Sequence, residues 1–154
     1  MSSYVNFYLK NGKNGTITYL FGYSRSSAIY EIFYENFLNH QTKDGYCDEL
    51  TQADCEKLVR AALDKKSFEL NIIQSYEKSI KDLATWNNSV DEKMEYYSDW
   101  DRCINQAKED IEAYEHATSF YSILGEMIDW NPHKTSILAG IDCYAYKEEE
   151  LEDN

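Results

Sequence analysis

The fold is decided by residues 89–130, which read SVDEKMEYYSDWDRCINQAKEDIEAYEHATSFYSILGEMIDW. Apolar or small side chains recur every seven residues through this stretch, in two parallel rows. One row contains Tyr97, Ile104, Ile111 and Thr118, and the other contains Trp100, Ala107, Tyr114, Tyr121 and Ile128. Two rows sustained over several heptads are typical of a helix that packs along its length against another helix. The stretch therefore predicts one long helix with a helical partner.

The preceding segment supplies that partner. Residues 51–54, Thr-Gln-Ala-Asp, resemble a capping box, and apolar residues then recur at spacings of three and four as far as Leu83. Residues 85–88 interrupt the pattern, and residues 89–92 form a second capping box. Two long helices joined by so short a turn form an antiparallel helical hairpin.

The length of this hairpin raises a question about its shape. A helix of roughly 30–40 residues would be ~45–60 Å long at a rise of 1.5 Å per residue, which is longer than a compact domain of this size. We therefore expect that part of the hairpin projects. Alternatively, one helix is broken, and Gly125 and residues 67–68 are then the weak points.

Strand patterns lie at the N-terminal end. Residues 4–10 alternate between apolar and other side chains, residues 11–15 contain two glycines suited to a turn, and residues 16–21 are rich in β-branched and aromatic side chains. These features predict a β-hairpin. We expect one face of its first strand to carry Val5, Phe7 and Leu9, and one face of its second strand to carry Ile17, Tyr19 and Phe21.

A short helix and a final strand complete the predicted fold. Serines before Ala28 can cap a helix that ends near Asn39, and residues 40–49 read as a loop. Pro132 ends the long helix, and residues 135–146 form a strand with Gly140 as a candidate bulge.

The sequence therefore predicts an α+β fold with the order β-β-α-α-α-β. A small antiparallel sheet is made from the N-terminal hairpin and the C-terminal strand, and it is combined with a short helix and a long antiparallel helical hairpin. We assign residues 1–146 to a single domain and residues 147–154 to an acidic, disordered tail.

The negative charge is concentrated in two segments. The chain has 28 acidic and 15 basic residues and a net charge of −13. Residues 88–115 contribute −6 and residues 147–154 contribute −4, whereas residues 1–40 contribute +1. An acidic surface is repelled by nucleic acid phosphates and by anionic lipid. We therefore expect a basic partner protein, with no direct binding to nucleic acid or to a membrane.

The outward face of the helix over residues 89–130 is the candidate binding surface. We assign to it Asp91, Glu92, Glu95, Tyr96, Asp99, Glu109, Asp110, Glu112 and Glu115. Carboxylates spaced along a helix can compete with nucleic acid phosphates for the same Lys and Arg side chains, and Tyr96 adds aromatic contact area. The alternative is a solvated face that only keeps the protein soluble.

No sequence motif indicates catalysis or a bound metal. Glu112 and His116 lie four residues apart, but a di-metal helical bundle needs a Glu-x-x-His motif on each of two helices. His40, Cys47 and Cys55 match no zinc-binding spacing. Because no export signal is visible, we expect the four cysteines to be reduced and mostly buried, in a cytoplasmic protein of a bacterial host cell. We predict no enzymatic activity, no catalytic residue, no cofactor and no metal.

Residues 4–9 (YVNFYL), 21–27 (FGYSRSS) and 29–30 (IY) resemble the opening of small accessory proteins of phages and mobile elements from low-GC Gram-positive bacteria. The rest of the chain, which is short, acidic and rich in tyrosine, is similar in character to anti-CRISPR proteins that inhibit Cas nucleases, some by imitating nucleic acid. This resemblance implies a phage-encoded, non-enzymatic inhibitor of a basic nucleic-acid-handling protein such as a CRISPR effector nuclease. It assigns no site residue, because that group shares no common motif.

A second hypothesis belongs to a different class. The alternative is a structural or assembly protein of a phage or mobile element that associates with itself. The long hairpin or an exposed sheet edge would then pair with copies of itself in a homo-oligomer.

Overall fold

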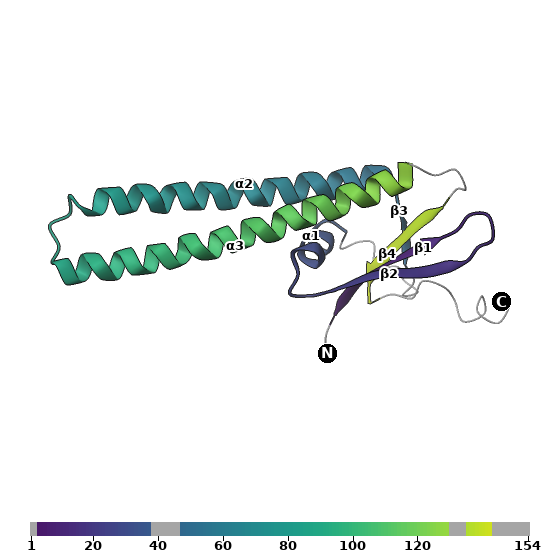
Figure 1. Cartoon of the computed structure of the whole chain (residues 1–154), viewed down its shortest axis with the longest axis horizontal. Coiled ribbons are helices and arrows are strands. Elements are labelled where there is room, and N and C mark those ends of the chain that lie inside the picture. The colour runs from purple at the N-terminus through teal and green to yellow at the C-terminus, as the bar shows by residue number, and fades with distance from the viewer. Residues whose placement is uncertain (1–2, 38–46, 130–134, 143–154) are drawn as a thin grey trace.

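The computed structural model of this chain describes residues 3–37, 47–129 and 135–142, and it combines a four-stranded antiparallel sheet with three helices (Figure 1). The elements in chain order are β1 (Tyr4–Lys10), β2 (Ile17–Ser24), α1 (Ala28–Asn36), β3 (Asp48–Leu50), α2 (Gln52–Leu83), α3 (Val90–Asp129) and β4 (Ser136–Ile141). This architecture confirms the predicted α+β class and the order β-β-α-α-α-β, to which it adds the short strand β3. Residues 147–154, the predicted tail, lie outside the described residues.

The sheet has the strand order β2-β1-β4-β3, so the C-terminal strand lies beside the first strand. Phe7 of β1 pairs with Ala139 of β4, and Leu50 of β3 pairs with Ile137 on the other side of β4. The predicted loop is wrong at residues 48–49, which belong to β3. Its acidic sequence has low strand propensity, and the strand forms because its backbone pairs with β4.

A register shift in the first hairpin changes which side chains share a face. Phe21 pairs with Phe7, but Tyr19 pairs with Tyr8, and the shift falls between Phe7 and Tyr8. Directly paired residues lie on the same face of an antiparallel sheet. Phe21 therefore lies on the core face and Tyr19 on the opposite face, and the prediction that they share one face is wrong. Gly140, the candidate bulge, instead pairs in uninterrupted register with Asn6.

The two long helices begin at the predicted capping sequences. The Thr51 hydroxyl accepts a hydrogen bond from the Asp54 amide (3.1 Å), and the Asp54 carboxylate accepts one from the Thr51 amide (2.9 Å). At α3, the Ser89 hydroxyl accepts from the Glu92 amide (3.2 Å), but the Glu92 carboxylate accepts from the side chain of Asn88 instead of closing the box. The first box is complete and the second is half formed.

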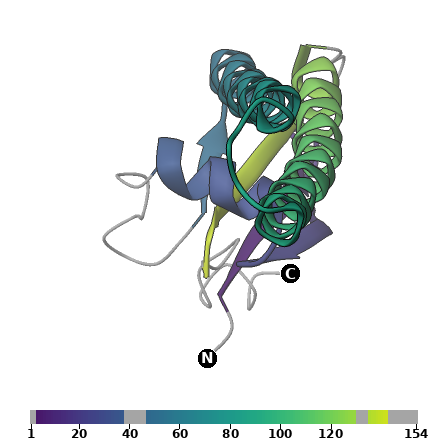
Figure 2. The same ribbon diagram turned by 90° about the vertical axis from the view of Figure 1, so that its left-hand side faces the viewer.

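One face of the sheet, α1 and the adjoining turns of α2 and α3 enclose the main core (Figure 2). The Phe7 ring lies at the centre of this core and is fully buried. Its centroid lies 5.0 Å from that of Phe120, 6.1 Å from that of Phe33 and 6.3 Å from that of Tyr121. The Tyr121 hydroxyl donates a hydrogen bond to the carbonyl oxygen of Ile29, which fixes α1 against α3. We call this part of the molecule the base.

The remainder of the hairpin projects beyond the sheet (Figure 1), and we call residues 66–112 the arm. Both helices are continuous, so the alternative of a break at Gly125 or at residues 67–68 is not realised. A small cluster of Ile73, Ile104 and Ala107 holds the arm together.

The heptad rows describe most of the contact between the two helices. Ile104, Ala107, Tyr114 and Tyr121 are buried. The exception is Tyr97, which is 43% exposed. A straight α-helix drifts by ~20° per heptad relative to a seven-residue repeat. Because Tyr97 lies at the end of its row, this drift carries it out of the contact.

Candidate protein-binding surface

The predicted acids lie on the solvent side of α3. Exposed positions are occupied by Asp91, Glu92, Glu95, Tyr96, Asp99, Glu109, Glu112 and Glu115, whereas Asp110 is half-buried. Asp91, Glu95 and Asp99 follow one another at intervals of four residues, so they form a stripe along one side of the helix. The structure therefore brings the N-terminal half of the predicted set together on one exposed face.

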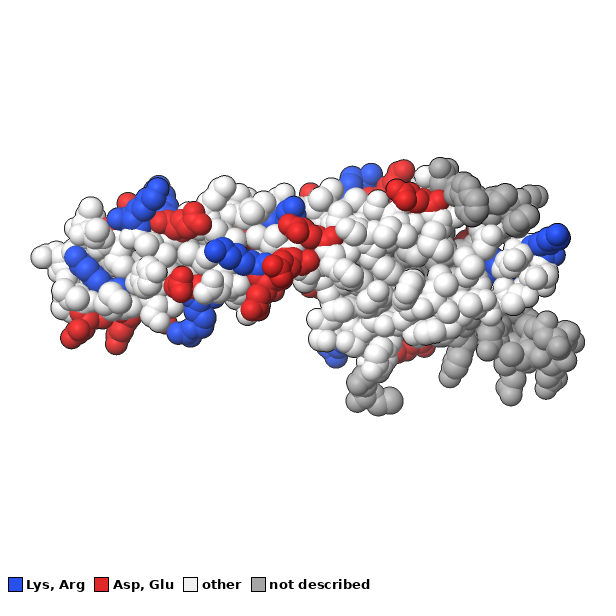
Figure 3. Space-filling view, in the orientation of Figure 1, with Lys and Arg blue, Asp and Glu red and all other residues white. Residues whose placement is uncertain are grey.

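Neighbouring basic side chains neutralise part of this set. Arg102 lies 3.0 Å from the Asp99 carboxylate, and Lys66 of α2 lies 3.2 Å from that of Glu115. The side of the arm seen in Figure 3 also shows Lys and Arg side chains among the acids. Within residues 3–37, 47–129 and 135–142, the predicted acids that make no ion pair with Lys or Arg are Asp91, Glu92, Glu95, Glu109, Asp110 and Glu112. The acidic surface is thus a stripe and not a uniformly negative arm.

An aromatic cluster lies at the far end of the arm. The centroid of Trp86, in the turn between α2 and α3, is 5.6 Å from that of Tyr96 and 5.7 Å from that of Trp100. Tyr96 and Trp100 stack with their centroids 5.5 Å apart. Sequence reasoning placed Tyr96 on the surface but treated Trp86 only as an interruption of the helix. The sequence feature that could have indicated this cluster is the presence of a tryptophan in a short polar turn.

A charge cluster joins α1 to the hairpin at the base of the arm. The Lys65 ammonium lies 3.0 Å from the Glu31 carboxylate and 2.9 Å from that of Glu35, and the Tyr114 hydroxyl lies 3.3 Å from Glu31. Burial lowers the pKa of Lys65, but the hydrogen bonds that its ammonium donates to Glu35 and Glu31 outweigh this effect, so the pKa is raised. Burial and the charge of Glu31 raise the pKa of Tyr114 to about 12. Lys65 therefore stays charged and holds two elements together.

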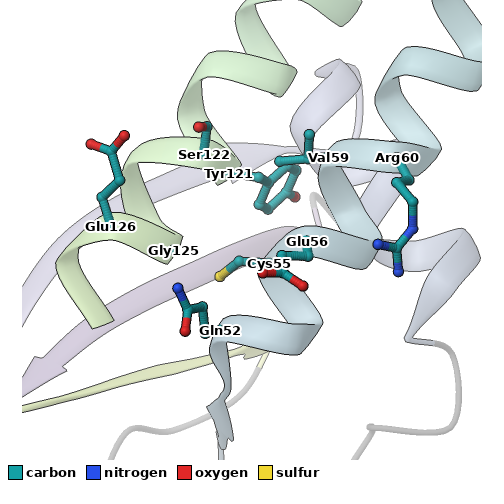
Figure 4. A pocket seen from close by; sticks show the side chains of 9 residues that line it. All are labelled: Gln52, Cys55, Glu56, Val59, Arg60, Tyr121, Ser122, Gly125 and Glu126. Atoms are coloured by element: carbon teal, nitrogen blue, oxygen red, sulfur yellow. The ribbon is translucent and has the colours of Figure 1, made fainter. Parts of the chain in front are cut away.

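A cavity of about 340 Å³ lies between the first turns of α2 and the last turns of α3 (Figure 4). Its lining consists of Gln52, Cys55, Glu56, Val59, Arg60, Tyr121, Ser122, Gly125 and Glu126. Burial, with the charges of Asp54 and Glu56, raises the pKa of the Cys55 thiol to about 12. The thiol is therefore protonated at neutral pH, which makes it a poor nucleophile and a poor metal ligand.

The cysteines differ from one another in state. Cys55 is a buried free thiol and Cys103 is a half-buried free thiol. Cys47 is disulfide-bonded, so the prediction of a reduced thiol is wrong for this residue. A disulfide stabilises chiefly by restricting the unfolded chain, an effect that local sequence spacing does not reveal. Cys143 lies outside the described residues.

Of the two metal-binding patterns considered in the sequence, only that of Glu112 and His116 lies wholly within the described residues. No group of three or more His, Cys, Asp or Glu side chains there could hold a metal ion. Glu112 and His116 both point to solvent as exposed residues, and His40 lies outside the described segments. Among those segments, every helix is too short or too polar to cross a lipid bilayer.

Comparison with known protein families, curated proteins and solved structures finds no match to this chain.

Proposed function

We propose that this protein is a non-enzymatic interaction protein that presents the acidic face of α3 to a basic, nucleic-acid-binding surface of another protein. One observation carries the proposal. The arm projects beyond the sheet, and its outer face holds exposed carboxylates that no basic side chain of the described chain neutralises, among them Asp91, Glu95, Glu109 and Glu112. Such carboxylates are available to a partner without first breaking an internal ion pair.

The spacing of these carboxylates limits how the surface would act. Residues four apart on an α-helix are separated by ~6 Å along the helix axis. In a DNA duplex, each strand carries one phosphate for every ~3.4 Å along the duplex axis. The stripe that contains Asp91 and Glu95 therefore has roughly half the linear charge density of a single strand. It would compete for Lys and Arg side chains in a groove without reproducing the phosphate spacing in detail.

The resemblance to phage accessory proteins and anti-CRISPR proteins selects the first partner to test. A Cas nuclease in the bacterial cytoplasm has a positively charged channel for its guide and target strands. Occupation of this channel by the arm would block nucleic acid loading without any chemical step.

The test is a comparison of two variants with equal loss of charge. The first combines Asp91→Asn, Glu95→Gln, Glu109→Gln and Glu112→Gln. The control neutralises four exposed acids elsewhere, Glu56, Asp64, Glu77 and Glu126. We expect the first variant to bind a Cas nuclease at least tenfold more weakly than the control, and to show a shallower dependence of affinity on salt. Equal weakening in both variants would show that net charge, and not this face, drives binding.

A second function is favoured by the free edge of the sheet. β2 is eight residues long and lies at one edge of the sheet, where it pairs only with β1 among the described strands. Tyr19 and Phe21 on this strand are 56% and 45% exposed. An edge of this length can pair with a second copy of the chain. Light scattering would detect a dimer. If β2 forms the contact, Thr18→Pro should dissociate this dimer into monomers. A chain that stays monomeric at high concentration contradicts this function.

A further inference from the structure

The tip of the arm exposes aromatic and aliphatic area that no other part of the described chain covers. Trp86 and Tyr96 of the aromatic cluster are 38% and 42% exposed. Val90 and Met94, in the first turns of α3, are 74% and 59% exposed. Aromatic side chains that remain half open to water although they pack against each other are typical of interaction sites.

Carboxylates surround this apolar area. Residues 84–102 contain five acidic residues and two basic residues, Lys93 and Arg102, and Arg102 pairs with Asp99 at 3.0 Å. Glu92 precedes Tyr96 by four positions and Asp99 follows it by three, so both lie next to Tyr96 on the surface of the helix. The tip therefore combines exposed π-faces with negative charge at the same place.

This combination decides between possible occupants. An apolar partner would have to desolvate the surrounding carboxylates without compensation, and a second copy of the tip would bring like charges together. A guanidinium satisfies both features, because it is planar, weakly hydrated, stacks on aromatic rings and binds carboxylates with two parallel hydrogen bonds. An ammonium is compact and strongly hydrated, so it gains less from the rings.

We propose that the tip of the arm binds an arginine side chain of a basic partner protein, with the guanidinium stacked on Trp86 or Tyr96 and held by Glu92. This inference rests on the proposed function and deepens it, because it names the residue type that the partner must present. The acidic stripe would attract the basic surface, and the tip would select arginine over lysine within it.

The test uses two peptides of equal charge, nona-arginine and nona-lysine, titrated into the full-length protein by calorimetry. We expect the wild-type chain to bind nona-arginine about three- to tenfold more tightly than nona-lysine, as stacking of one guanidinium predicts. Trp86→Leu should reduce this preference to near parity. Phe68→Leu, which removes an aromatic ring that is 64% exposed elsewhere on α2, should leave it intact.

Further outcomes separate this inference from the proposed function. The variant with neutral residues at positions 91, 95, 109 and 112 should bind both peptides more weakly and keep the preference for arginine, because its tip retains Trp86, Tyr96 and Glu92. If it binds both peptides as tightly as the wild type and still prefers arginine, the proposed role of the acidic stripe fails and the tip site stands. Equal binding of the two peptides by the wild type overturns the tip site. So does a preference that survives both Trp86→Leu and Tyr96→Leu in variants whose circular dichroism shows unchanged helix content.

Discussion

The base and the arm are made from the same two helices but are held together differently. Among the described residues, the base core contains eighteen buried side chains from strands, α1 and both long helices, whereas the arm core contains three, supported by half-buried neighbours. Phe7 of the base contacts rings from three other elements, β2, α1 and α3. In the arm, Ile104 packs only within a contact between two helices. The contacts of the base therefore contribute most of the free energy of unfolding.

This difference indicates how the two parts share their tasks. A two-helix contact with few buried residues opens more readily than a core enclosed by several elements. The arm in turn carries the exposed carboxylates and the aromatic tip. The base fixes where the arm begins and in which direction it projects, and the arm supplies the surface. Substitutions in the two parts should accordingly produce different kinds of effect.

The largest effect should come from the base. Phe7→Ala removes a fully buried ring at the centre of the core, and it should reduce the free energy of unfolding by about 3–5 kcal/mol. Equilibrium denaturation in guanidinium chloride measures this loss. Phe68→Ala is the matched control, because that ring is mostly exposed, and it should cost far less. A loss below ~1 kcal/mol for Phe7→Ala would show that the core is not organised around this ring.

Ile104→Ala tests the arm. The side chain is 6% exposed, but it has few packed neighbours, and these can move into the space that the substitution leaves. We therefore expect the free energy of unfolding to fall by ~2 kcal/mol, at the low end for such a change. Hydrogen exchange should show faster exchange for amides near residues 73 and 104 and unchanged protection near residues 117–124. A uniform change across both regions would contradict the separation between base and arm.

Tyr121→Phe tests how α1 is joined to α3. The ring of Tyr121 stays buried in this variant, but the carbonyl oxygen of Ile29 loses the donor that lies outside α1. A lost hydrogen bond of this kind costs ~1–3 kcal/mol when the acceptor remains buried. We expect a loss of ~1 kcal/mol, because α1 can shift so that this oxygen reaches water. Denaturation measures the loss, and Tyr97→Phe, at an exposed position of α3, should have almost no effect.

Regular patterns within one element were predictable from the sequence. The seven-residue rows of α3 identified Ile104, Ala107, Tyr114 and Tyr121 as buried, because a helix places residues by a fixed angle. The capping sequence at Thr51 located the start of α2 for a similarly local reason. Each of these features depends only on residues a few positions apart.

Features that depend on distant partners were not predictable in this way. β3 forms because β4 offers a backbone to pair with, although residues 48–49 have no strand pattern. The register shift at Leu20 of β2 places Tyr19 and Phe21 on opposite faces, and no glycine or proline stands at the shifted position itself. The position of Trp86 against Tyr96 follows from the turn geometry between two helices. These cases share a cause, since each depends on how one element of the fold meets another and not on the pattern within one element.

The smallest predicted effect concerns the boundary between arm and base, where like charges meet. Burial, followed by the charges of Asp110 and Glu31, raises the pKa of the Glu69 carboxyl, although Lys65 opposes this. The folded chain therefore takes up this proton more readily than the unfolded chain, so ionised Glu69 destabilises the fold at neutral pH.

Glu69→Gln should remove this cost. We expect a gain in the free energy of unfolding of at most ~0.5 kcal/mol at pH 7, because Glu69 is only half-buried and solvent screens its charge. The gain should shrink as the pH falls through the raised pKa and vanish below the ordinary glutamate value of about 4.3, where both states are protonated. Denaturation of the variant, of wild type and of the exposed control Glu77→Gln at several pH values measures this difference. A gain that does not change with pH would show that packing of the amide, and not the removal of charge, stabilises this boundary.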